Sequence, residues 1–211
     1  MKDMLEPLYK YCDNHTTIQN ETLLDIERKT HLQTLAPRML SGHLQGSFLS
    51  LLSKMLAPKY ILEIGTFTGY SAICLAQGLR ESGRLITVES DKAISEFALN
   101  SISIAGFEDK IELIHGDAKK IISDLDMMFD MVFIDADKES YSLYYDLVID
   151  KCNSGAVIIA DNVLWSGKVI EPKMDKQTKL LDEFNKKVYS DPRVECVILP
   201  IRDGLNVIRV I

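Results

Sequence analysis

The chain has 211 residues, of which 46% are hydrophobic and 26% charged, with a formal net charge of −7. This size suits one globular domain with a full core, and every apolar run is shorter than the roughly 18 residues of a membrane helix. The negative charge disfavours broad electrostatic binding of nucleic acid.

The first 56 residues are expected to be helical, and strands and helices alternate after them. Apolar spacing predicts helices at 21–35 and 43–56, with Pro37 interrupting the pattern. The expected strands are 60–64, 84–89, 111–114, 130–134, 156–160, 195–199 and 205–210. The expected helices between them are 70–79, 93–105, 118–125, 141–152 and 175–189, with a loop at 162–174.

This order predicts an α/β fold, a Rossmann-like, doubly wound, seven-stranded and mostly parallel sheet with the N-terminal helices packed on it. Asp203-Gly204 indicates a closing hairpin, so one strand should be antiparallel. We expect a single domain over 1–211, with a helical cap at 1–56 and the core at 57–211. The N-terminus lacks the apolar segment of a secretion signal, so a cytoplasmic protein with no membrane contact is expected.

The four cysteines lie far apart in the sequence. Cys12, Cys74, Cys152 and Cys196 form no C-x-x-C pair, which argues against a zinc site and for reduced thiols. Cys74 and Cys196 lie in apolar patterns and are expected in the core.

Polar side chains follow two of the expected buried strands. Asp135 and Lys138 come after the strand at 130–134, and Asp161 and Asn162 follow the strand at 156–160. Side chains just past the carboxyl ends of parallel strands meet in one crevice. Three hard oxygen ligands there predict a site for Mg²⁺ or a similar cation such as Mn²⁺ or Ca²⁺, with the Lys138 amine placed to move a proton.

The first strand leads into a loop with Gly65 and Gly69, whose G-x-x-x-G spacing is neither a dinucleotide fingerprint nor a P-loop. Glu89, at the end of the next strand, suits ribose hydroxyls, and Glu63 suits a cationic amino group or a loop amide. Two acids would repel a pyrophosphate, which favours S-adenosylmethionine over NAD. A turn that simply needs glycine, and an exposed strand-end acid at 89, are the alternatives.

The turn at 116–118 follows the third strand and would lie over an adenine in this fold. Asp117 can accept a hydrogen bond from the exocyclic amine, or it can be the N-cap of the next helix.

Together, these residues resemble the class I, divalent-metal-dependent O-methyltransferases of the catechol and caffeoyl-CoA type and their bacterial relatives. The motifs that carry the resemblance are PRMLSG at 37–42, LEIGTFTGYS at 62–71, DADK at 135–138 and DNVLWSG at 161–167. The resemblance covers the chain from about Leu35 to its end.

The resemblance implies a role for each matching residue. Asp135, Asp161 and Asn162 would be metal ligands, Lys138 the general base, and Trp165 part of the acceptor pocket wall. The implied cofactor-binding residues are Met39, Ser41, Glu63, Gly65, Thr66, Ser71, Glu89, Asp117, Ala118 and Asp135. Ala136-Asp137 replaces the His-Trp of mammalian catechol enzymes, and the segment at 166–175 is short for the insertion that helps plant enzymes bind coenzyme A.

The expected reaction is methyl transfer from S-adenosylmethionine to a hydroxyl of a small catechol-like acceptor, in a protein that is often dimeric in this family. The first alternative acceptor is 5-hydroxyuridine in tRNA, for which Arg38, Lys168, Lys173 and Arg202 would form a basic rim. Other readings are an NAD-dependent oxidoreductase and a binding module without catalysis. For Lys138 alone, the alternative is a salt bridge to Asp137 or Glu139.

Overall fold

The computed structural model describes residues 2–211; Met1, the first residue of the predicted cap, lies outside them. The strands are β1 (Tyr60–Ile64), β2 (Arg84–Glu89), β3 (Ile111–His115), β4 (Phe129–Ile134), β5 (Cys152–Asp161), β6 (Val194–Leu199) and β7 (Leu205–Val210). The helices are α1 (Lys2–Asn14), α2 (Glu21–Gln33), α3 (Gly42–Leu56), α4 (Tyr70–Ala76), α5 (Lys92–Ile104), α6 (Ala118–Asp124), α7 (Tyr141–Ile149) and α8 (Lys176–Ser190). Three 3₁₀ turns are η1 (Pro37–Met39), η2 (Lys138–Ser140) and η3 (Trp165–Ile170).

The strands form one seven-stranded sheet in the order β3-β2-β1-β4-β5-β7-β6. The pairs among β1 to β5 are parallel, whereas β7 runs antiparallel to both β5 and β6. The predicted doubly wound, mostly parallel sheet with one antiparallel strand is confirmed. The division into a cap at 1–56 and a core at 57–211 stays a prediction.

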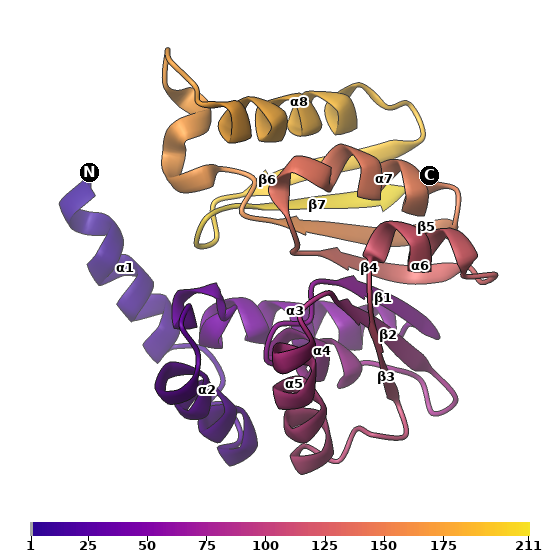
Figure 1. Cartoon of the computed structure of the whole chain (residues 1–211). Helices are drawn as coiled ribbons and strands as arrows, with labels where there is room; N and C mark the ends of the chain where they lie inside the picture. The colour runs from indigo at the N-terminus through magenta and orange to yellow at the C-terminus, as the bar shows by residue number, and fades with distance from the viewer. Residues whose placement is uncertain (1) are drawn as a thin grey trace.

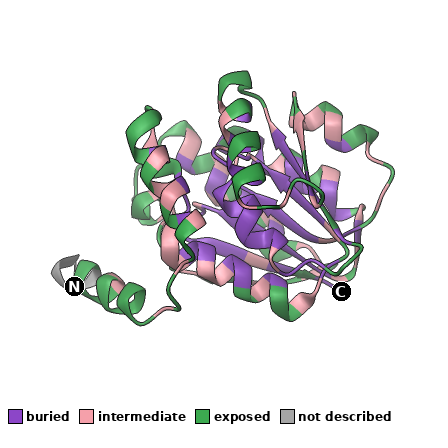
Figure 2. Cartoon of the chain, turned by 90° about the horizontal axis from the view of Figure 1, so that it is seen from below, coloured by how far each residue is buried: buried purple, intermediate pink, exposed green. Residues whose placement is uncertain are grey.

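Helices cover both faces of the sheet (Figure 1). One core cluster joins the sheet to α6, α7 and α8, and includes Ile122, Tyr145 and Phe184. The other joins the sheet to α2, α3 and α4, and includes Ile26 and Leu49. In Figure 2 the central strands are buried between these layers, whereas α1 extends from the body and is mostly exposed over residues 6–14.

The register of the parallel strands brings the candidate site residues to one edge of the sheet. Ile64, at the end of β1, pairs with both Val88 of β2 and Ile134 of β4. Ile134 in turn pairs with Ala160 of β5. The segments that follow β1, β4 and β5 therefore begin side by side.

The structure departs from the sequence-based expectation in several places, among them the helix expected at 70–79, which ends at Ala76. The helix expected to reach residue 152 ends at Ile149, because β5 already begins at Cys152 and pairs with Phe129 across a register shift. The loop expected at 162–174 contains η3. Cys74 is buried as expected, whereas Cys196 is only half-buried, because it lies on β6, an edge strand with one open side.

None of the helices in residues 2–211 combines the length and apolar character needed to cross a membrane.

Candidate active site

Asp135 and Asp161 end two neighbouring strands, as predicted. Asp135 directly follows β4, and Asp161 is the last residue of β5. Asp161 is almost fully buried, and the side chain of Asp135 is 21% exposed. Burial and then the charge of Asp135 raise the pKa of Asp161 above its usual range. The two carboxylates thus act on each other at the same edge of the sheet.

Three hydrogen bonds fix Asp161. Its Oδ2 accepts from Nε2 of Gln45 at 2.6 Å, and its Oδ1 accepts from the backbone N–H of Asn162 at 2.6 Å. Its backbone carbonyl accepts from the Tyr141 hydroxyl at 2.9 Å. Asn162 itself has a φ of 57°, so the chain turns sharply as it leaves the strand.

Lys138 lies between the two acids in a buried position. Its Nζ donates to Oδ1 of Asp135 at 2.8 Å and to the Tyr141 hydroxyl at 2.7 Å. Burial raises the pKa of Tyr141 well above its usual value, as do the charges of Asp135 and Asp161, so the phenol keeps its proton. Because the phenol donates to a backbone carbonyl, its oxygen accepts from Lys138. Tyr141 therefore links Lys138 to the backbone of Asp161.

The alternative reading of Lys138, a salt bridge to Asp137 or Glu139, is wrong. Asp137 accepts instead from the Tyr144 hydroxyl at 2.6 Å, and Glu139 pairs with Lys176 at 3.1 Å. The ion pair of Lys138 is with Asp135.

The glycine-containing loop after β1 lies against the segment that follows β4. Gly65 has a φ of +99°, and a Cβ on it would stand 2.1 Å from the carbonyl oxygen of Asp135. A side chain at this position would push the two segments apart. Gly65 therefore serves the packing between the two predicted sites, and the neighbouring Thr66 hydroxyl bonds to Thr87 at 2.6 Å.

Glu63 is a fully buried carboxyl group beneath this loop. Burial raises its pKa to about 8, although the Ser71 and Thr87 hydroxyls lower it in part. Its Oε2 accepts from Thr87 at 2.5 Å, and its Oε1 has no hydrogen-bond partner among residues 2–211. Glu63 is thus a buried carboxyl group whose raised pKa favours the protonated form and whose Oε1 is unsatisfied.

The carboxylate of Glu89 is held by the backbone. Its Oε2 accepts from the N–H of Phe67 at 2.9 Å, and its Oε1 accepts from the N–H groups of Ser90 and Asp91 at 2.8 and 2.9 Å. These bonds fix Glu89 beside the glycine loop; Glu89 is half-buried, and its contact with ribose hydroxyls stays a prediction.

Asp117 is the N-cap of α6, since its Oδ1 accepts from the N–H of Lys119 at 3.0 Å. Ala118 is the first residue of that helix, and Gly116 bonds to the backbone of Glu89 at 2.8 Å. The N-cap reading is confirmed, and the contact of this turn with an adenine stays a prediction.

Met39 and Ser41 lie on the segment between α2 and α3. Met39 is 57% exposed on η1, and Ser41 is buried at the start of α3. The guanidinium of Arg202 donates to the backbone carbonyls of Leu40 and Ser41, and to that of Arg38 at 3.3 Å. The turn between β6 and β7 thereby fixes this segment.

Trp165 is half-buried against the core cluster that contains α7 and α8. The same β6–β7 turn anchors it, because Asp203 accepts from the N–H of Ser166 and, through its backbone carbonyl, from Leu164 at 2.9 Å. The β6–β7 turn therefore holds both the segment at Met39 and Ser41 and the segment at Trp165.

Sequence reasoning missed Gln45 and Tyr141. The signal for Tyr141 was its place one helical turn after Lys138, on a helix start that faces the sheet. The apolar pattern at 43–56 contains no signal for Gln45, because the residues that α3 buries are Gln45, Gly46, Leu49, Ser50 and Ser53.

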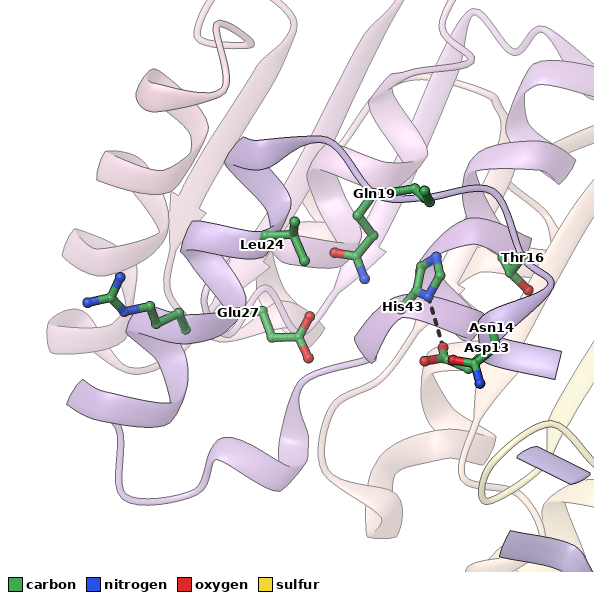
Figure 3. Close-up of a pocket in the computed structure, with 9 residues that line it drawn as sticks. Asp13, Asn14, Thr16, Gln19, Leu24, Glu27 and His43 are labelled. Carbon is green, nitrogen blue, oxygen red and sulfur yellow. Dashed lines mark hydrogen bonds and ion pairs between the residues drawn. The ribbon is translucent and has the colours of Figure 1, made fainter. Parts of the chain in front are cut away.

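A separate cavity of about 570 Å³ lies between the α1–α2 connection, α2 and the start of α3. Figure 3 shows His43 beside Asp13 in this cavity, with their side chains 2.9 Å apart, and Gln19 and Glu27 on its other walls. Its lining includes none of the predicted site residues.

Among the side chains that the structure describes, those of residues 6–211, no three of His, Cys, Asp or Glu gather as a metal site. The predicted set differs from such a cluster because it has two carboxylates and an amide.

The fold and these residues agree with the comparisons to known proteins. The family model described as O-methyltransferase matches residues 13–211. The caffeoyl-CoA O-methyltransferase of Populus kitakamiensis is 37% identical over 178 residues, covering 78% of this chain and 75% of that protein. The O-methyltransferase of Bacillus cereus, solved in complex with SAH, is 29% identical with a TM-score of 0.91 and full coverage of both chains. An SAH-bound methyltransferase of Podospora anserina is 26% identical with a TM-score of 0.91, covering 99% and 96%.

The chain belongs to the O-methyltransferase family, a family of S-adenosylmethionine-dependent enzymes. The resemblance seen in the motifs is confirmed. This assignment excludes the NAD-dependent oxidoreductase considered above.

Proposed function

We propose that the protein transfers a methyl group from S-adenosylmethionine to one hydroxyl of a vicinal dihydroxy aromatic acceptor, with the help of a divalent cation. The observation that carries the proposal is the buried arrangement of Asp135, Lys138 and Asp161, linked through the Tyr141 hydroxyl. Acids from two strand ends with an amine between them suit a reaction in which a hydroxyl must lose its proton.

Asp135, Asp161 and Asn162 would hold the cation, which we take to be Mg²⁺ or, in its place, Mn²⁺ or Ca²⁺. Carboxylate and amide oxygens are the hard ligands that these ions prefer. Burial and the charge of Asp135 raise the pKa of Asp161 although Lys138 is close, so a cation bound there would stabilise the ionised form of Asp161. When bound, the cation would supply Lewis acidity that favours the ionised acceptor hydroxyl.

Lys138, as the neutral amine, would take the proton from that hydroxyl and become the ammonium. Two of its N–H groups are directed at Asp135 and Tyr141, which leaves the third position of the amine for proton exchange. The acceptor oxygen would then attack the methyl carbon as the bond from carbon to the sulfonium sulfur breaks. Holding the two reactants at attack distance is a large part of such catalysis.

The part of this sheet edge formed by the ends of β1, β2 and β3 would bind the methyl donor. Glu63, with its unsatisfied Oε1, suits the amino group of the methionine end, near Ser71 and the backbone of Gly65 and Thr66. Glu89 would accept from the ribose hydroxyls. The turn at Asp117 and Ala118 would lie over the adenine, with Met39 and Ser41 closing the cofactor site and Asp135 at its border.

The acceptor chemistry has support from the relatives' names. Several are named caffeoyl-CoA O-methyltransferases, and a caffeoyl group carries two neighbouring ring hydroxyls. In this chain the segment between Trp165 and α8 is occupied by η3 and a few exposed residues. We therefore propose a free catechol, rather than a coenzyme A thioester, as the preferred acceptor.

A tRNA acceptor has less support. Of the four cations in the hypothetical basic rim, Arg202 is engaged with backbone carbonyls, and Lys168 is paired with Asp175 at 3.5 Å. We also propose a homodimer, since the outer face of α3 exposes Leu51 and Met55 at 61% and 74%.

The experiment is methyl transfer from labelled S-adenosylmethionine to catechol, caffeic acid, caffeoyl-CoA, phenol and bulk tRNA, each with Mg²⁺ or with excess EDTA. We expect transfer to catechol and caffeic acid with Mg²⁺, and loss of transfer with EDTA. Equal transfer to phenol, or full activity in EDTA, would contradict the proposal. Transfer to bulk tRNA and to none of the small molecules would identify tRNA, rather than a catechol, as the acceptor. Light scattering after size-exclusion chromatography tests the dimer.

A further inference from the structure

A fully buried glutamine on α3 reaches across the molecule to the proposed metal site. Gln45 has no exposed surface, and its Nε2 donates to Oδ2 of Asp161, 116 residues away, at 2.6 Å. The Oε1 atom of the same amide is buried and has no hydrogen-bond partner among residues 2–211. As a metal ligand Asp161 would be an ionised carboxylate, which only accepts, so the Gln45 amide directs its nitrogen at Asp161 and leaves its oxygen unsatisfied.

This arrangement costs stability. A buried amide oxygen without a donor loses its hydration and gains nothing in return. An apolar side chain of similar size would fill the same space without that loss. If stability alone decided this position, glutamine would be a poor choice, which points to a role in orienting Asp161.

The contacts of Asp161 define that role. Gln45 holds Oδ2 from the side of α3, and the Asn162 N–H holds Oδ1 from the chain itself. Each carboxylate oxygen has a second lone pair, so both bonds orient the group without blocking it. Partners that orient a ligand in this way commonly raise metal affinity.

We propose that Gln45 is a positioning residue that orients Asp161 as a ligand of the divalent cation. The inference rests on the proposed function, because it takes Asp161 as a metal ligand. Gln45 also lies one helical turn after Ser41, whose carbonyl accepts from Arg202. The start of α3 therefore contacts both the proposed cofactor segment and the proposed metal site.

The test is the affinity for Mn²⁺, measured by electron paramagnetic resonance of the free ion in the full-length protein. Gln45→Met keeps the volume and removes the hydrogen bond, and it should raise the Kd for Mn²⁺ by about 10- to 100-fold. Its melting temperature should stay equal or rise, because the unsatisfied oxygen is gone. S-adenosylmethionine affinity in EDTA should not change. Gln45→Leu gives the same measurement if Gln45→Met does not fold.

Ser53→Ala is the matched control on the same helix. Ser53 is buried and its hydroxyl donates to the carbonyl of Leu75 at 2.6 Å, away from Asp161. This variant should lower the melting temperature and leave the Kd for Mn²⁺ unchanged.

Two results would overturn the inference while leaving the proposed function intact: wild-type Mn²⁺ affinity in Gln45→Met, or an equal loss of affinity in Ser53→Ala. Failure of the wild type to bind Mn²⁺ more tightly than Asp161→Ala would overturn the metal assignment as well. The measurements thus separate the two failures.

Discussion

Asp130, near the amino end of the central sheet, and two buried acids at its carboxyl end, Glu63 and Asp161, are in opposite electrostatic states. At the amino end, Asp130 of β4 accepts from the N–H groups of Lys59 and Tyr60 at 2.7 and 3.1 Å, and from the Asn153 amide at 2.8 Å. Burial alone would raise the pKa of Asp130, but these hydrogen bonds and the charge of Arg80 lower it. At the carboxyl end, burial dominates, and the pKa values of Glu63 and Asp161 are raised.

The difference separates structural acids from functional ones. Asp130 has enough donors to stay ionised and needs nothing further. For Glu63 and Asp161 the stabilising groups, which for Asp161 include Lys138, do not offset the effect of burial, so we propose that each suits a cationic ligand. We propose that Glu63 binds the ammonium group of the methyl donor and that Asp161 binds a metal ion, and the predictions below test this contrast.

The largest effect is expected at Asp161. Asp161→Ala should abolish metal-dependent methyl transfer, because it removes a ligand that the other site residues cannot replace. The affinity for S-adenosylmethionine should stay nearly intact, since Glu63 and Glu89 are untouched. Turnover and calorimetric binding of the cofactor in the same preparation check both statements, and a variant that keeps wild-type turnover contradicts the assignment.

Lys138 should give the next largest effect. We expect Lys138→Met to lower kcat by about 10² or more, the range of general acid–base catalysis, with a smaller change in KM. Lys176→Met is a suitable control, because Lys176 pairs with Glu139 on the exposed surface near the same turn. An unchanged kcat in Lys138→Met, or an equal loss in both variants, removes Lys138 from the role of base.

The sequence predicts the sheet well because apolar runs and glycine turns are local signals. It also predicts that residues after β1, β4 and β5 share an edge, since parallel connections place them there. The departures arise where non-local pairing decides: Cys152 joins β5 because it pairs with Phe129, which periodicity around residue 152 does not reveal.

The support of the site is also non-local. Gln45 meets Asp161 across 116 residues, and Arg202 meets Ser41 across 161. Such contacts depend on the packing of α3 against the sheet and on the turn between β6 and β7. Motifs therefore identify the candidate site residues, while the side chains that orient them emerge only from the fold.

Glu63 should control a pH effect and the cofactor affinity. Its folded pKa is about 8, against 4.5 for the ordinary group, so the folded protein holds one more proton than the unfolded chain between these values. The free energy of unfolding should therefore fall as pH rises through this window, by up to about 1.4 kcal/mol per pH unit. Glu63→Gln should flatten this dependence in urea titrations from pH 5 to 8.

The same variant tests the proposed ammonium partner. A cation beside Glu63 favours the ionised carboxyl, so S-adenosylmethionine binding at pH 7 should release up to about one proton in the wild type and none from Glu63→Gln. The variant should also bind the cofactor roughly 10- to 100-fold more weakly. Calorimetry in buffers of different ionisation enthalpy measures both, with Glu112→Gln, on the exposed rim of the sheet, as the unaffected control.

The smallest effect on activity is expected for Asp130, in contrast to Glu63 and Asp161. Asp130→Ala should leave kcat and KM unchanged while lowering the free energy of unfolding by about 1–3 kcal/mol, because three donors lose their acceptor. The lowered pKa of Asp130 means that this contribution is present above the pKa of the unfolded carboxyl, near 4, and is lost as pH falls through the folded value. Urea titrations at pH 7 and pH 3 should therefore differ more for the wild type than for the variant. A loss of turnover in a folded Asp130→Ala protein would show that the amino end of the sheet also acts on catalysis, and the division between the two ends would fail.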